Sequence, residues 1–125
     1  MIGTLGWIGV GGALGATLRY LVVLAVQRLT GTVVWLPWGT LVVNIAGSIA
    51  AGALMGWLST HTTAPSMARP FLMVGVLGGF TTFSAFSVES LAMLQAGRIA
   101  APIAYAVVSV TACIAGAWIG LKCST

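Results

Sequence analysis

Two phenylalanines three residues apart, Phe83 and Phe86, stand among hydroxyl side chains within a long apolar segment. Residues at this spacing share one face of a helix. An aromatic ring has a positive edge and a negative face, so two ring edges can contact a small anion without a full positive charge that would trap it. Packing is the ordinary role of such a pair, but the hydroxyls of Thr81, Thr82 and Ser84 beside it favour a binding role.

A polar stripe precedes this segment. Thr40, Asn44 and Ser48 recur every four residues, so on a helix they lie along one face. A primary amide inside an apolar helix needs hydrogen-bond partners. Asn44 therefore either bonds to a neighbouring helix or donates to a ligand.

A second stripe with the same spacing lies near the end of the chain, at Tyr105, Ser109 and Cys113. The tyrosine alone is typical of an anchor at the membrane interface. Because the serine falls on the same helix face, the stripe also suits a polar path.

Two charged residues lie well inside apolar segments. Glu89 is the only acidic residue of the chain, and an ionisable group at such depth is a candidate functional residue of undefined role. Arg19 has two interpretations, since its side chain can extend to the interface or face water or a partner.

The elements that must position these residues are membrane helices. The 125 residues are 59% hydrophobic and only 5% charged, and the mean hydropathy is +1.10. Such a chain has too few polar side chains to cover a water-soluble domain. The five basic residues are dispersed, which argues against a nucleic-acid-binding protein. The sequence has no nucleophile with an adjacent base and no carboxylate pair, so no residue pattern indicates an enzyme.

Hydropathy divides the chain into four spans that form one all-α transmembrane domain over residues 1–125, since a spanning helix needs roughly 20 apolar residues. Small residues of the first span, Gly11, Gly12, Gly15 and Ala16, have the spacing that lets membrane helices approach closely. The four spans are predicted at residues 3–29, 38–58, 70–95 and 100–121.

The third span is predicted to be broken at its middle. Adjacent glycines, Gly78 and Gly79, weaken a helix, and the hydroxyls that follow compete for backbone hydrogen bonds. Freed backbone groups are tolerated within a membrane only where protein buries them or a wet cavity receives them. The break therefore predicts a binding site.

The basic residues do not orient the chain. With four spans, Arg69 and Lys122 fall on one side and Arg28 and Arg98 on the other, and the positive-inside rule needs an excess on one side. The chain is therefore expected to insert both ways and to form an antiparallel homodimer with its two-fold axis in the membrane plane.

Three segments resemble the motifs of the Fluc (CrcB) fluoride channels, and the resemblance extends over essentially the whole chain. They are GGALGATLRY (Gly11 to Tyr20), WGTLVVNIAGS (Trp38 to Ser48) and GVLGGFTTFSAFSVE (Gly75 to Glu89). The third motif is the most specific. The resemblance implies a dual-topology homodimer with two pores, passive export of fluoride, and a place in the inner membrane of a prokaryote.

The same resemblance implies roles for single residues. Asn44 would donate to fluoride beside the rings of Phe83 and Phe86, and Tyr105 and Ser109 would continue the path. Thr40 and Ser84 would add hydroxyls, and Arg19 would concentrate anions at the pore vestibule. Cys113 departs from the family, which often has a hydroxyl there, and a thiol is a weaker donor.

A structural sodium ion is also expected at the centre of the dimer. The break frees backbone carbonyls, which a cation can satisfy collectively, and the resemblance selects those of Gly78 and Thr81. The neutral ligands favour a monovalent ion.

One rival function is a proton-coupled multidrug exporter of the small four-span type, also often dual in topology. Those exporters resemble one another in having an essential Glu in the first span. In this chain the single acid, Glu89, lies in the third span.

Overall fold

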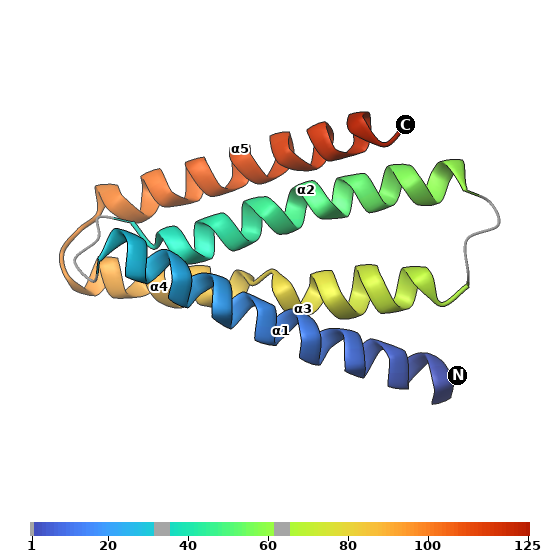
Figure 1. Ribbon diagram of the computed structural model, residues 1–125. Helices are drawn as coiled ribbons and strands as arrows, with labels where there is room; N and C mark the ends of the chain where they lie inside the picture. Colours follow the sequence, from blue (N-terminus) through green and yellow to red (C-terminus); the bar gives the residue numbers. More distant parts are fainter. Residues whose placement is uncertain (1, 32–35, 62–65) are drawn as a thin grey trace.

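The structure, a computed structural model, describes residues 2–31, 36–61 and 66–125. Its helices run side by side, and both chain termini lie at the same end of the bundle (Figure 1). The segment from residue 69 to residue 95 is helical except at Thr81 and Thr82. The helices are α1 (Ile2–Thr30), α2 (Trp38–Thr60), the π-helix η1 (Arg69–Leu77), α3 (Gly78–Phe80), α4 (Phe83–Gln95) and α5 (Ala100–Cys123).

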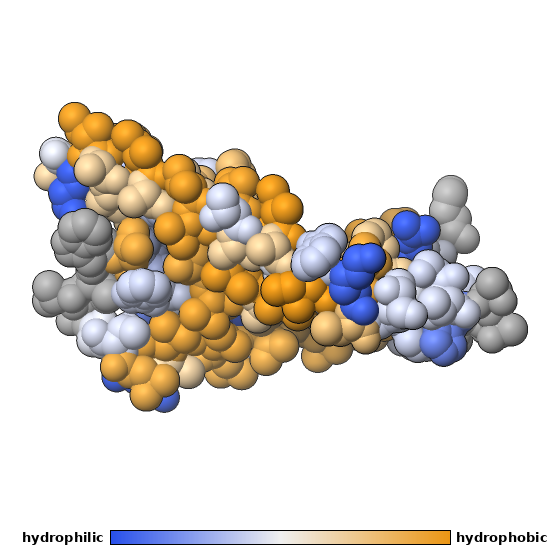
Figure 2. Space-filling model, turned by 90° about the horizontal axis from the view of Figure 1, so that it is seen from above, coloured by the Kyte–Doolittle hydropathy of each residue, from blue (hydrophilic) through white to orange (hydrophobic). Residues whose placement is uncertain are grey.

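Four helical stretches of the described chain are long and apolar enough to cross a membrane: α1, α2, the run Arg69–Gln95, and α5. The prediction of an all-α chain with four spans is thereby confirmed. Many large apolar side chains point outward, such as Leu18, Val74 and Ile114, and hydrophobic residues cover much of the middle of the face shown in Figure 2. An apolar surface of this extent suits contact with lipid.

Glycines let α1 lie directly against the third span. A Cβ atom at Gly11 would come within 2.6 Å of the Phe71 carbonyl oxygen, and one at Gly15 would overlap the Val76 carbonyl oxygen. The close approach predicted for the small residues of the first span is confirmed at these positions. Glycine also permits close packing of α2 against α5, where a Cβ at Gly52 would overlap the Ala117 carbonyl oxygen.

The backbone of the third span leaves the helical conformation later than its glycine pair suggests. Gly78 and Gly79 are helical, within α3, whereas Thr81 (φ −80°, ψ 158°) and Thr82 (φ −154°, ψ 121°) are extended. Gly79 instead serves packing, since a Cβ there would lie 2.5 Å from the Gly12 carbonyl oxygen. The glycines permit close approach to α1, and the threonines carry the non-helical backbone.

Candidate functional site

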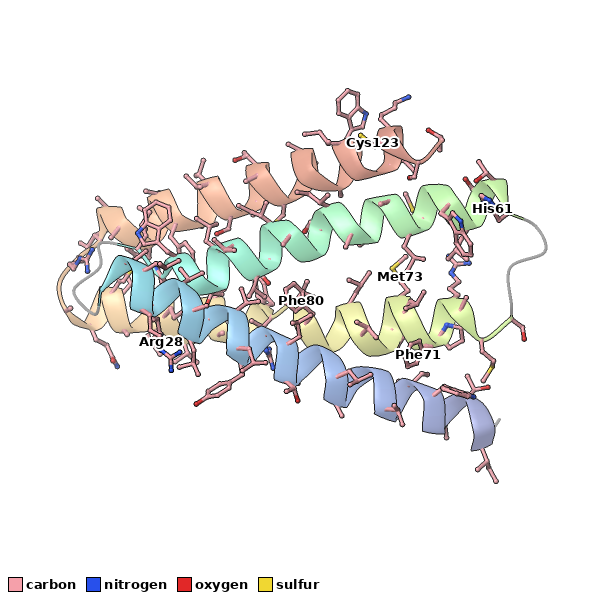
Figure 3. The ribbon with its side chains drawn as sticks, viewed as in Figure 1. Arg28, His61, Phe71, Met73, Phe80 and Cys123 are labelled. Carbon is pink, nitrogen blue, oxygen red and sulfur yellow. The ribbon has the colours of Figure 1, made fainter. Side chains whose placement is uncertain are left out.

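A pocket of about 470 Å³ opens beside the extended threonines, between α2, α5 and the third span. Its lining combines apolar surface with a few polar groups, and no basic side chain is part of it. In Figure 3 the side chain of Met73, one of the lining residues, extends from η1 toward α2. Other lining residues are Asn44, Ser48, Thr82, Phe83, Phe86, Ser109 and Cys113.

Asn44 holds the extended backbone of Thr82 with both ends of its amide. Its Nδ2 donates to the Thr82 carbonyl oxygen (3.0 Å), and its Oδ1 accepts from the Thr82 N–H (2.8 Å). The predicted alternatives for Asn44 were a helix-to-helix bond and a ligand. The structure shows a bond to the neighbouring span, and the donation to a ligand stays a prediction, for which one amide hydrogen remains because an NH₂ group carries two.

Thr82 is the residue of this site whose role sequence reasoning missed. Its hydroxyl caps α4 by accepting from the Ala85 N–H (3.2 Å) and lies 3.2 Å from Ser84 Oγ. A threonine before a helical run is a known N-cap pattern, so the sequence did contain a signal for where α4 begins. Its pairing with Asn44 has no such local signal, because the two residues are distant in the chain.

The extended residues take away the usual helical donors of several carbonyl groups, among them those of Gly78 and Thr81. In a continuous α-helix the Thr82 N–H would donate to the Gly78 carbonyl oxygen, but here it donates to Asn44 Oδ1. The Ala85 N–H would donate to the Thr81 carbonyl oxygen, but here it donates to the Thr82 hydroxyl. Gly78 and Thr81 are the two residues that the family resemblance implies for a cation site, and both line the pocket.

Glu89 accepts hydrogen bonds from two residues that were predicted to lie on the fluoride path. The Thr40 hydroxyl donates to Glu89 Oε1 (2.6 Å), and the Tyr105 hydroxyl donates to Oε2 (2.9 Å). Thr40 is 3% exposed and Tyr105 is 0% exposed, so the carboxylate satisfies two buried hydroxyls at once. The structure therefore joins α2, α4 and α5 through the one acidic side chain.

Phe83 and Phe86 lie in contact but in different surroundings. Their ring centroids are 5.3 Å apart, and the Phe86 ring lies 4.8 Å from that of Tyr105. Phe86 packs against the buried cluster that contains Leu41 and Tyr105, whereas Phe83 is 77% exposed. One ring belongs to the interior and the other projects from the surface of the single chain.

Ser109 contributes an unsatisfied hydroxyl to the pocket. The residue is 8% exposed, and its Oγ has no hydrogen-bond partner among the described residues. Cys113 lines the pocket one helical turn further along α5. A buried polar atom without a partner is rare in proteins and commonly marks a place where water or an ion binds.

Five predicted residues lie outside this pocket lining: Thr40, Tyr105 and Glu89, which are hydrogen-bonded to one another as described above, and Ser84 and Arg19. Ser84 is exposed and reaches the site only through its contact with Thr82. Arg19 is partly exposed on α1, which does not contribute to the lining of the pocket.

Comparison with known proteins gives a consistent result. A family model described as "CrcB-like protein, Camphor Resistance (CrcB)" matches residues 6–121. The chain is 50% identical over 116 residues to a protein of Hyphomonas neptunium, covering 91% of this chain and 89% of that protein. It is 48% identical over 107 residues to one of Methylobacterium nodulans, covering 86% and 84% respectively. Both relatives are named fluoride-specific ion channel FluC.

Proposed function

The chain belongs to the CrcB-like family, and from that premise we propose that it is a fluoride-selective channel that lets the anion leave the cell passively. The observation that carries the proposal is the pocket beside Thr82, which brings Asn44, Phe86 and Ser109 together and has no basic side chain in its lining. Neutral donors and ring edges suit a small anion that must bind briefly and move on.

The predicted donors to fluoride are not equivalent, and Thr40 and Tyr105 lie outside the lining of this pocket. The Thr40 and Tyr105 hydroxyl protons point to Glu89, and a hydroxyl has only one proton to donate. Ser109 lines the pocket with a buried hydroxyl that has no partner among the described residues, and Asn44 retains one amide hydrogen. We therefore assign the first contacts with fluoride to Ser109, Asn44 and the edge of Phe86, with Thr40 and Tyr105 joining when they release the carboxylate.

Glu89 acts as a positioning residue in this proposal. Its hydrogen bond from the Tyr105 hydroxyl orients the Tyr105 ring, which in turn packs against Phe86. A carboxylate repels an anion, and the two hydroxyl groups that donate to Glu89 partly compensate its negative charge.

The pore is completed in an antiparallel homodimer. The even division of Arg69 and Lys122 against Arg28 and Arg98 supports insertion in both orientations. Exposure of the Phe83 ring beside the pocket supports a partner surface at mid-membrane. Arg19, by family resemblance, draws anions to the mouth of each pore.

A sodium ion on the two-fold axis would satisfy the Gly78 and Thr81 carbonyls of both subunits. The support is that the usual donors to these carbonyls bond to Asn44 and to the Thr82 hydroxyl. Replacing sodium by a large organic cation during purification should lower the thermal stability of the dimer, and added sodium should restore it. Equal stability in both buffers would remove the ion from the proposal.

The multidrug-exporter alternative is set aside by the family to which the chain belongs. The relatives come from bacteria, so we place this multi-pass protein in a bacterial inner membrane.

Fluoride efflux from liposomes that contain only the purified protein tests the function. Potassium is allowed to leave through an added ionophore, and fluoride and chloride efflux are compared in matched vesicles. We expect fluoride to leave quickly and chloride to be retained. Equal passage of the two anions, or no fluoride flux at verified incorporation, would overturn the proposal.

A further inference from the structure

Cys113 places a thiol on the wall of the candidate ion path. It lines the same pocket as Asn44, Phe86 and Ser109, and it is a free cysteine of intermediate burial. Since Ser109 and Cys113 are four residues apart on α5, their side chains share one helix face. The thiol therefore follows the hydroxyl along the pocket wall.

The unsatisfied Ser109 hydroxyl independently indicates that this part of the wall meets a polar occupant. The residue is more than nine-tenths buried, and its Oγ has no partner among the described residues. A buried hydroxyl without a protein partner is satisfied by water or a ligand. Water that reaches Ser109 is within one helical turn of Cys113, so small water-soluble reagents can take the same route.

We propose that Cys113 is a thiol-modification site on the ion path, where reagents that transfer a sulfur group obstruct fluoride. The expected block of fluoride flux rests on the proposed function. The modification of Cys113 is argued from the pocket alone. The ligand class comprises thiosulfonates and activated disulfides. The pocket, at about 470 Å³, has room for a small adduct, and an adduct there takes space beside Ser109.

The chemistry is a thiol exchange that balances without an added oxidant. The Cys113 thiol gives its proton to water, and the thiolate sulfur attacks the sulfenyl sulfur of a methanethiosulfonate. A new S–S bond forms between protein and reagent as the reagent's own S–S bond breaks. Methanesulfinate leaves with the electron pair, and a reducing thiol reverses the modification.

The test uses the trimethylammonioethyl methanethiosulfonate, whose permanent charge excludes it from lipid and limits it to watery routes. It is applied to both faces of liposomes that hold the full-length protein, at mildly alkaline pH to raise the thiolate fraction. Fluoride efflux and the mass of each cysteine-containing peptide are measured on the same sample. We expect an adduct at Cys113 and loss of most of the flux, with recovery after reduction.

Matched variants separate the two cysteines. Cys123 is exposed near the end of α5, and its side chain is labelled at the end of the bundle in Figure 3. Cys123→Ser should remain sensitive to the reagent, whereas Cys113→Ser should keep its own untreated flux after treatment. Cys113→Ala serves the same purpose if the serine variant does not assemble.

Each outcome decides the inference. Flux that persists with a full adduct at Cys113 would place the thiol off the path, and an adduct only at Cys123 would show that Cys113 is closed to water. Absence of fluoride flux before treatment would contradict the proposed function, and with it the expected block of flux. In that case the peptide masses still decide whether Cys113 is modified.

Discussion

At the scale of single residues, the two phenylalanines of the site have different surroundings. Phe86 packs against the Tyr105 ring and the buried cluster, and Phe83 is largely exposed. An anion path that uses ring edges requires both, because an aliphatic side chain of similar polarity lacks the positive edge. The rings can therefore be tested without changing the apolar character of the span.

We expect Phe83→Ile and Phe86→Ile each to lower fluoride flux at least roughly tenfold, which corresponds to about 1.4 kcal/mol on the barrier. The dimer should remain assembled on size-exclusion chromatography. Phe71→Ile is the matched control, since Phe71 contacts Trp7 at the α1 side of η1 and does not line the pocket. Normal fluoride flux in both pocket variants would show that the two rings serve only in packing.

Glu89 gives a second prediction at this scale. Glu89→Ala leaves the buried hydroxyls of Thr40 and Tyr105 without their acceptor, at a cost of about 1–3 kcal/mol for each unsatisfied group. Glu89→Gln keeps a bonding partner of the same shape. We expect the alanine variant to melt at lower temperature and lose flux, and the glutamine variant to recover much of both. Identical behaviour of the two variants would show that the bonds to Thr40 and Tyr105 do not position the site.

At the scale of secondary-structure elements, Asn44 couples α2 to the extended residues of the third span. Asn44→Asp keeps the shape of the side chain, but an ionised carboxylate cannot donate to the Thr82 carbonyl. We expect a loss of about 1–3 kcal/mol in stability and a fall in flux. Ser48→Ala, one turn further on the same face, is the control for stability because it leaves the Asn44–Thr82 pair intact. A stable, active aspartate variant would contradict this role.

The contact between α1 and the third span depends on glycine. Gly15→Ala would drive a methyl group into the Val76 carbonyl oxygen and to 2.8 Å from the Phe80 nitrogen, both of them backbone atoms. We expect this variant to assemble poorly in detergent. Gly9→Ala, on the same helix with nothing within 4 Å, should be neutral or more stable by up to about 1 kcal/mol. Equal yields of the two variants would argue against close packing at Gly15.

At the scale of the whole molecule, the proposed dual orientation rests on a small charge balance. Both termini, the end of α2 and the start of η1 lie at one end of the bundle (Figure 1). The double variant His61→Lys with Ser66→Lys adds two charges at that end and should direct it to the cytoplasm. A reporter fused to the C-terminus measures orientation, and fluoride resistance of the cells measures function.

The double variant with lysines should lose function because an antiparallel dimer needs both orientations. Co-expression with Thr30→Lys and Gln95→Lys, which bias the opposite end, should restore fluoride resistance. The uncharged double variant with glutamine at positions 61 and 66 is the control. Full resistance from one fixed orientation alone would exclude the antiparallel dimer.

The amino-acid sequence by itself determined the four apolar spans and the polar stripes on them. Span prediction succeeds because a bilayer imposes a length and a composition that can be read locally. The four-residue spacing of Thr40 and Asn44, and of Tyr105 and Ser109, follows helix geometry in the same way. The small residues of the first span likewise indicated where another helix approaches.

Only the tertiary structure decided which polar groups meet. Thr82 rather than Gly78 became extended because Asn44, on another helix, bonds to both of its backbone groups. Glu89 acquired a role because α2 and α5 bring two buried hydroxyls to its carboxylate. Both outcomes depend on pairings between residues distant in the chain, and local propensity and periodicity carry no information about such pairings.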